Sequence, residues 1–187
     1  MLLAGIGIYV ASRPVAPKSK ANTQQQVTLK TFEDKQLGVK FSIPTEYQQR
    51  PDTPAPDGQK DPRPAKNFER LNPQGLITVR YESGLGTPAT LSKRPLLEYI
   101  ETEIRQFFPV KYKGYVGTSF DKITVADREA LGHIYSYTDS DGKPVKARLI
   151  VVAFDSDSAY YLILQAHRDR YERVKTDLDR VKDSLQI

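Results

Sequence analysis

The sequence contains no cysteine and no tryptophan, and only two histidines and one methionine occur among its 187 residues. The absence of cysteine excludes a disulfide framework, a thiolate metal site and a cysteine nucleophile. The chain also lacks the Gly-x-Ser-x-Gly motif of hydrolases and the His-Glu-x-x-His motif of metalloproteases. These gaps predict a protein that is not an enzyme.

A basic surface for nucleic acid is also missing, although the formal net charge is +5. Residues 1–26 hold Arg13, Lys18 and Lys20 and no acid, so cations exceed acids by only two over the rest of the chain. Binding of nucleic acid requires a basic patch, commonly with interleaved aromatic residues, and no such cluster stands out. We therefore expect no nucleic-acid partner.

The first eleven residues, MLLAGIGIYVA, are apolar and uncharged. A membrane-spanning helix needs about 20 such residues, and no basic region precedes this run. We interpret residues 1–11 as a partial signal anchor or transmembrane segment; a signal-peptide core and a frayed N-terminal strand are the alternatives. Residues 12–26 have few large apolar side chains and indicate a flexible linker. The predicted domain is therefore residues 27–187, tethered to a membrane.

The strongest fold signal runs from Glu129 to Ala166, where three apolar strands are joined by two short polar turns. Residues 148–154 and 160–166 are continuous apolar runs, which indicates strands covered on both faces. Turns as short as residues 139–143 and 155–158 require antiparallel neighbours. The pattern predicts an antiparallel meander with helices on both sides.

The remaining elements follow from shorter patterns. We expect hairpins of residues 27–32 with 38–44 and of residues 68–71 with 76–82, the second closed by a type I or II turn. A further strand is expected at 115–125. The Pro-rich loop at 44–64 favours disorder over a binding loop, because Tyr47 is its only aromatic residue.

Two helices are predicted from apolar residues at spacings of three and four. In the first, Ser92 is the expected cap and Pro109 the expected end. The second is expected to pack on its own sheet, because its repeat is too short for a coiled coil. The apolar stripes are Leu97, Ile100, Ile104 and Phe107 or Phe108 in the first, and Tyr171, Val174, Leu178, Val181 and Leu185 in the second.

Several of these segments resemble the PsbP-like family, which comprises the extrinsic lumenal subunit of photosystem II and bacterial extracytoplasmic relatives. The similar segments are residues 38–44 with Tyr47, the strand 77–81, the strand 161–166 and residues 183–185. The resemblance spans roughly residues 30–187, and the Pro-rich loop departs from it. It implies an α+β fold, an α/β/α sandwich with a central antiparallel sheet flanked by helices. It also implies docking to other proteins without enzymatic activity, and some members bind Mn, Ca or Zn.

The two histidines are the only imidazole ligands or bases. Alternation along the strand places His133 on one face with Leu131, Tyr135 and Tyr137, which favours a hydrogen-bonded histidine beside aromatic rings over a metal ligand. His167 is expected at a solvated strand end. Residues 139–142 copy the start of a calcium loop, but Ile150 stands where that loop needs glutamate, so a hairpin turn is expected. No resident cofactor is predicted.

The sequence therefore leads to one function and one alternative. The first is a non-enzymatic protein-binding or scaffold domain on the extracytoplasmic side of a bacterial cell envelope, docking to another envelope or membrane protein. The alternative is an envelope domain that binds a small ligand or Zn, Mn or Ca through His133, and a hydrolase ranks third. Tyrosine suits interfaces, so docking is expected at an exposed sheet edge or around Tyr112, Tyr115, Tyr135 and Tyr137.

Overall fold

The computed structural model describes residues 27–52, 64–86 and 94–187. The predicted anchor at 1–11, the linker at 12–26 and the expected cap Ser92 lie outside these ranges. Within them, neither helix combines the length and the apolar character that crossing a membrane requires.

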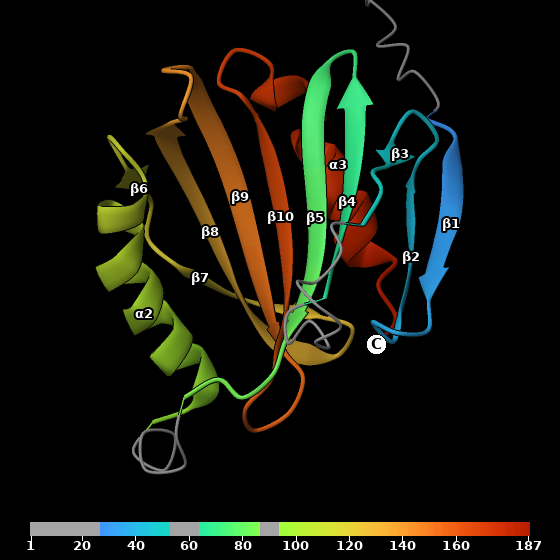
Figure 1. Ribbon diagram of the computed structural model, residues 1–187. Coiled ribbons are helices and arrows are strands. Elements are labelled where there is room, and N and C mark those ends of the chain that lie inside the picture. The colour runs from blue at the N-terminus through green and yellow to red at the C-terminus, as the bar shows by residue number, and fades with distance from the viewer. Residues whose placement is uncertain (1–26, 53–63, 87–93) are drawn as a thin grey trace, which may run out of the picture.

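The described chain forms two antiparallel sheets and two helices (Figure 1). β1 (Leu29–Asp34) and β2 (Val39–Pro44) form a hairpin. The eight-stranded sheet has the order β3 (Gln48–Gln49), β4 (Ala65–Leu71), β5 (Gln74–Glu82), β10 (Ala159–His167), β9 (Pro144–Ala153), β8 (Arg128–Thr138) and β6 (Val116–Gly117), and β7 (Asp121–Val125) also pairs with β8. Helices α2 (Leu96–Lys111) and α3 (Tyr171–Asp183) lie on opposite faces of this sheet, which confirms the predicted α+β sandwich.

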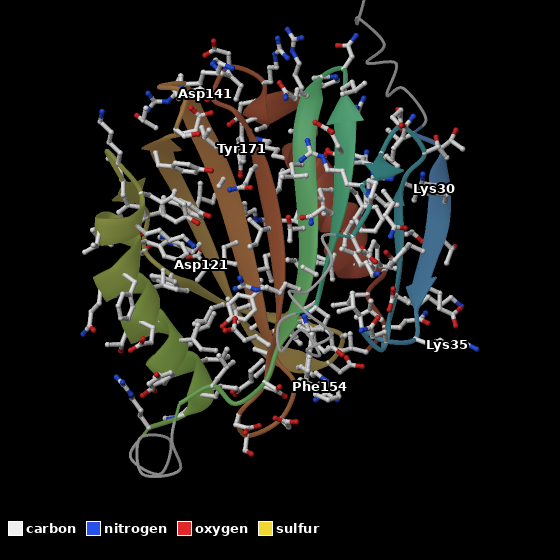
Figure 2. The ribbon with its side chains drawn as sticks, viewed as in Figure 1. Lys30, Lys35, Asp121, Asp141, Phe154 and Tyr171 are labelled. Atoms are coloured by element: carbon white, nitrogen blue, oxygen red, sulfur yellow. The ribbon has the colours of Figure 1, made fainter. Side chains whose placement is uncertain are left out.

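The predicted meander is confirmed as β8, β9 and β10, which are antiparallel neighbours. Ile150 and Leu162 face the α3 side and are fully buried, while Leu149 and Tyr161 face the α2 side and are nearly so. Covering on both faces explains why the sequence shows no alternation. The two turns lie at opposite ends of the sheet, as Asp141 and Phe154 show in Figure 2, so their carboxylates do not form a joint cation site.

The α3 face is closed by helix α3 and by the β1–β2 hairpin. All five residues of the predicted stripe are buried, so α3 packs on its own sheet as expected. The chain after α3 returns to the hairpin, where Lys40 and Gln186 exchange backbone hydrogen bonds of 3.0 and 2.8 Å. On this face Phe32, Phe41 and Phe68 form a ring cluster with centroids 4.8 to 5.6 Å apart.

The α2 face is covered only in part. Leu96, Ile100 and Ile104 pack over β8 and β9. On this face of β10, Ala159 and Tyr161 belong to the cluster buried beneath α2. No helix of the described chain covers the rest of β10 or strands β5 and β4, where the strand register places partly buried side chains such as Ile163 and Thr78. The expectation that helices cover the meander on both sides therefore holds for β8, β9 and one end of β10.

Three local predictions are wrong. Helix α2 continues through Pro109 to Lys111, because a proline in the last turn removes only one helical hydrogen bond. The expected strand 115–125 is two strands, β6 and β7, separated at 118–120. The strands β4 and β5 pair up to Leu71 and Gln74, so the loop is the two residues Asn72-Pro73 and not the predicted turn of residues 72–75.

The beginning of the Pro-rich loop is ordered, contrary to the prediction. Gln48 and Gln49 pair with β4, and Tyr47 is fully buried. The Tyr47 hydroxyl donates a hydrogen bond of 3.1 Å to Asp177 on α3, 130 residues further along the chain. This part of the loop is therefore ordered by contact with Asp177, a residue distant in the sequence, and the composition of the loop does not reveal that contact. Residues 53–63 of this loop lie outside the described part of the chain.

Candidate functional site

The four tyrosines that the sequence singled out meet at the C-terminal end of α2. Tyr112 lies 4.6 Å from Tyr137 and 5.7 Å from Tyr135 between ring centroids, and Tyr115 lies 5.9 Å from Tyr135. Phe108 of α2 packs on Tyr112, Tyr115 and Tyr135 at 5.1 to 6.0 Å. Residues from the helix, from the chain that follows it and from β8 therefore form one aromatic cluster.

The members of this cluster differ in exposure. Tyr135 is 2% exposed and lies in the core beneath α2, so its ring supports the others and cannot itself touch a partner. Tyr112, Tyr115 and Tyr137 are partly buried. Burial raises the pKa of Tyr137 to about 12 and also raises the pKa of Tyr115, so both phenols are neutral hydrogen-bonding groups at ordinary pH. A docking role for the three accessible tyrosines stays a prediction.

His133 lies at the edge of the same cluster. Its ring is stacked on Phe120 at 4.2 Å with an interplanar angle of 6°, and on Tyr135 at 5.6 Å. Its Nε2 is 2.7 Å from the Tyr115 hydroxyl. The residue is 2% exposed, and this burial lowers the pKa of the imidazole. We infer a neutral ring whose Nε2 accepts the hydrogen bond of Tyr115, the structural arrangement that the sequence favoured.

The second ring nitrogen of His133 is less well satisfied. Nδ1 is buried and makes no hydrogen bond of ordinary geometry in the described chain, although the Ser119 backbone lies near enough to oppose the lowering of the pKa. Across the described ranges, no three histidine, aspartate or glutamate side chains come together as metal ligands. Binding of Zn, Mn or Ca through His133 therefore stays a prediction, carried by this one residue. His167 lies at the end of β10, 3.7 Å from Asp169.

A groove that sequence reasoning missed adjoins the aromatic cluster at Phe108 and runs between α2 and strands β5 and β10. It has a volume of about 460 Å³, and Tyr99, Phe107, Arg80 and Tyr161 are among its lining residues. The Arg80 guanidinium lies 4.5 Å over the Tyr161 ring and pairs with Glu82 at 3.2 Å. Phe107 is 57% exposed at the rim.

The groove offers both polar and apolar contacts but no net charge. Its cations Arg80 and Lys111 are balanced by Glu82 and Glu103. The lining therefore does not select an ionic ligand. The Phe107-Phe108 pair was the one signal for this groove in the sequence. Phe108 packs in the aromatic cluster beneath α2, whereas the Phe107 side chain is exposed at the rim of the groove.

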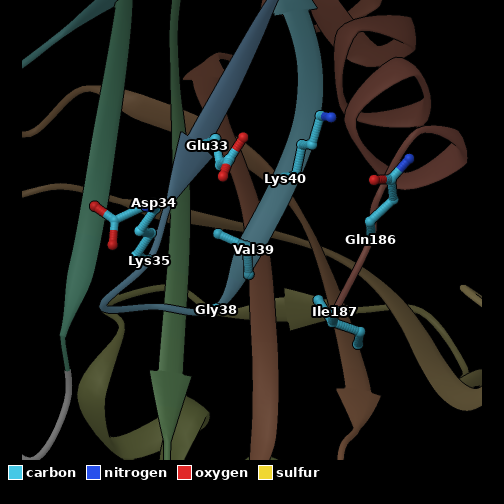
Figure 3. A pocket seen from close by; sticks show the side chains of 8 residues that line it. All are labelled: Glu33, Asp34, Lys35, Gly38, Val39, Lys40, Gln186 and Ile187. Carbon is cyan, nitrogen blue, oxygen red and sulfur yellow. The ribbon is translucent and has the colours of Figure 1, made fainter.

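A second hollow, of about 490 Å³, lies at the far side of the molecule where the β1–β2 hairpin meets the C-terminal residues (Figure 3). Its charged residues are Glu33, Asp34, Lys35 and Lys40, again two of each sign. The Asp34 carboxylate is already paired with Lys66 at 3.3 Å. This hollow is open and has no excess charge for a ligand.

Comparison with known proteins identifies the fold. No family model and no curated protein sequence matches the chain. Among solved structures, LpqN, involved in cell envelope biogenesis of Mycobacterium tuberculosis, is similar with a TM-score of 0.56 and 14% identity over 88% of this chain and 86% of LpqN. The cyanobacterial PsbP protein CyanoP from Synechocystis has a TM-score of 0.55 and 13% identity over 92% of this chain and 99% of its own.

The yeast Ran-binding protein Mog1p from Saccharomyces cerevisiae is also similar, with a TM-score of 0.55 and 7% identity over 86% of this chain and 96% of Mog1p. Identities this low establish the shared fold alone. The chain therefore has a PsbP-like fold, which confirms the fold that the sequence resemblance implied.

Proposed function

We propose that this chain is a non-enzymatic protein-binding domain of the bacterial cell envelope, tethered through residues 1–11 and acting on the extracytoplasmic side. The observation that carries the proposal is the partly covered α2 face, where accessible aromatic side chains flank the C-terminal end of the helix. LpqN, with the same fold, is involved in cell envelope biogenesis, and Mog1p binds Ran, which supports a binding role in the envelope.

The chemistry of the site favours docking over catalysis. His133 is neutral and stacked, and its Nε2 is already hydrogen bonded to Tyr115. A general base must reach the proton that it abstracts, and this ring is 2% exposed. Tyr112, Tyr115 and Phe107, in contrast, offer rigid ring surface whose contact with a partner costs little side-chain entropy. We propose these residues as the docking surface for another envelope or membrane protein.

The test uses site-specific photo-crosslinking in native membranes with the full-length chain. Benzoylphenylalanine replaces Phe107 or Tyr112 on the docking surface, and Leu29, which is 45% exposed on β1, serves as the control position. We expect one envelope protein to be captured from positions 107 and 112 and not from 29. Equal capture from all three positions, or no capture from 107 and 112, would refute this surface.

A pull-down from cross-linked membranes then separates the domain from its tether. Full-length chain and residues 27–187 are compared. Enrichment of the same envelope protein with both supports docking by the domain itself. If only the full-length chain captures partners, the N-terminal segment is responsible and docking by the fold is wrong.

The metal alternative predicts a different result. Addition of Zn, Mn or Ca would raise the melting temperature by several degrees, and His133→Ala would abolish the increase, because ligand binding to the native state stabilises it. The comparison is between each protein with and without metal, so the intrinsic cost of the substitution cancels. Under the docking proposal, neither protein shows a metal-dependent shift.

A further inference from the structure

The edge of β8 is covered by a short segment, residues 112–120, which we call the cover segment. Its strand β6 pairs only Val116 with Ser136 and Gly117 with Tyr135. Two further backbone hydrogen bonds, both 2.8 Å long, run from Thr118 to the Ile134 carbonyl and from Thr138 to the Lys113 carbonyl. Most of the segment is exposed, including Val116 at 70%. A segment with so few buried contacts belongs to the low-stability end of a fold.

Three aromatic side chains of the cover segment pack on β8. Tyr112 lies against Tyr137 and Tyr135, with ring centroids 4.6 and 5.7 Å apart, whereas Tyr115 and Phe120 contact His133. The Tyr115 hydroxyl is 2.7 Å from Nε2, and the Phe120 ring stacks on the imidazole at 4.2 Å. Gly117 permits this close approach, because a Cβ at that position would lie 2.7 Å from the His133 ring carbon Cε1. The part of the cover segment that follows Tyr115 is therefore held to β8 through His133, while Tyr112 anchors its beginning on Tyr135 and Tyr137.

The charges that face His133 come from each element packed against it. Helix α2 supplies Arg105 and Glu101, β7 supplies Asp121, and Tyr115 and Tyr135 are the adjacent phenols. Arg105 lies 4.9 Å over the outer face of Phe120 and pairs with Glu101 at 2.7 Å. Burial and Arg105 oppose protonation of His133 and outweigh Asp121, Glu101 and the Ser119 backbone, so the pKa of the ring is lowered from 6.5.

Protonation would disturb this packing. An imidazolium has no lone pair on Nε2, so Tyr115 can no longer donate to it, and the hydroxyl would have to turn its hydrogen away and accept from Nε2 instead. The cation would also lie between two rings at a position closed to water, which is costly unless the cover segment moves away. Once the segment is away, His133 is hydrated and titrates near its ordinary value.

We propose that the cover segment is an acid-released closure of the β8 edge, with His133 as the group whose protonation releases it. The inference goes beyond the proposed docking function and does not depend on it. Release leaves the outer backbone groups of residues 133–137 unpaired, which is the kind of strand edge that accepts another strand.

The direction of the pH effect follows from linkage. The closed form holds His133 neutral below its ordinary pKa of 6.5, whereas the open form binds a proton there. Opening is therefore favoured progressively as the pH falls below about 6.5. Between pH 7.5 and pH 5.5, the opening equilibrium should therefore increase, with about tenfold as the upper limit for one group of ordinary histidine pKa in the open form.

Hydrogen exchange of the full chain tests this, with rates at the two pH values corrected for intrinsic exchange. We expect the amides of Thr118 and Thr138 to lose protection at pH 5.5 relative to β10 amides, by at most about tenfold. His133→Gln keeps an acceptor without a titrating group and should abolish this difference. His167→Gln removes the only other histidine and should leave it unchanged.

Two outcomes would overturn the proposal. One is an equal pH effect in the parent protein and in His133→Gln. The other is a loss of protection that is the same in β10 as in the cover segment, because that would be global unfolding. If His133→Gln does not fold, Tyr115→Phe replaces it: protection at Thr118 should fall at both pH values while the pH dependence persists, and loss of the pH dependence would refute His133 as the titrating group.

Discussion

The two faces of the central sheet are built differently. The α3 face is closed by a helix and a hairpin over side chains that are almost all fully buried, among them Ile43, Ile77, Leu162, Val174 and Leu178. The α2 face carries a single helix over β8 and β9, tyrosines with partly accessible hydroxyls, and a groove. The comparison indicates that the α3 face supplies most of the stability.

The two faces also differ in how deeply they bury polar side chains. On the α3 face, the Asp177 carboxylate is 2% exposed and meets three partners: Tyr47 at 3.1 Å, Arg70 at 3.1 Å and Arg180 at 2.7 Å. Burial raises the pKa of Asp177 in spite of these cations, so the network is costly to assemble and damaging to break. On the α2 face His133 and Glu82 are buried, but other polar side chains are partly exposed, such as Gln165 and Tyr137, which are joined by a hydrogen bond of 2.8 Å.

The largest expected effect is a truncation on the α3 face. Leu178→Ala should lower the free energy of unfolding by about 4 kcal/mol, because it leaves a cavity in a fully buried position. The matched truncation on the α2 face, Ile104→Ala, should cost about 2 kcal/mol, since its site is partly open and can collapse. Urea denaturation measures both. If Ile104→Ala costs as much as Leu178→Ala, the stability is not divided between the faces as we infer.

The second largest loss of stability is expected on removal of the Asp177 side chain. Asp177→Ala leaves Arg70 without its buried partner and the Tyr47 hydroxyl without its acceptor, so we expect a loss of about 3 kcal/mol. The control on the same helix is Asp183→Ala, whose side chain is 65% exposed and pairs with Lys182, and it should change stability by less than about 0.5 kcal/mol. Similar losses in the two variants would show that the buried hydrogen bonds of Asp177 add no more to the free energy of unfolding than an exposed ion pair does.

A smaller effect is expected at Gly117. An alanine there would place Cβ 2.7 and 2.8 Å from atoms of the His133 ring, so Gly117→Ala should displace Tyr115 and cost about 2 kcal/mol. Gly132→Ala is the matched control, because its Cβ would make only ordinary contacts, at 3.7 Å or more. Denaturation gives the cost, and the ring-nitrogen NMR shifts of His133 report the hydrogen bond. An unchanged His133 spectrum would contradict the tight packing of the cover segment.

The smallest effect concerns the groove rim. Phe107→Ala should change the free energy of unfolding by less than about 0.5 kcal/mol, because a side chain that is 57% exposed contributes little to the core. The same variant should lose crosslinked partner, so binding and stability separate at this residue. A stability loss comparable to that of Ile104→Ala would instead make Phe107 a core residue and weaken the proposed surface.

Sequence patterns predicted the regular elements well where the signal is local. The continuous apolar runs of β9 and β10 and the stripe of α3 identify buried strands and a helix, because burial of one or both faces dictates where apolar residues must recur. The hairpin at residues 29–44 follows from alternation around Phe41 in the same way. Local patterns failed at Pro109 and at residues 118–120, where the ends of elements depend on neighbouring packing rather than on the residues themselves.

The candidate site shows the same limit. Alternation on one strand places His133, Tyr135 and Tyr137 together, and the structure confirms these neighbours. Alternation cannot show that α2 buries Tyr135 while Tyr112 joins it from the helix end, since that requires the helix to be placed on the sheet. The groove was missed for the same reason, because its two walls are distant in the sequence.

The sequence by itself therefore determined the order of the strands in the meander and the helix that packs on it, since each rests on the period of apolar residues along one segment, and the fold class followed from the resemblance to the PsbP-like family. Only the tertiary structure decided that Tyr47 is buried against Asp177, that α2 leaves part of its sheet face open and that Tyr115 and Phe120 of the cover segment meet at His133. These features depend on contacts between residues far apart in the chain, and no local periodicity encodes such contacts.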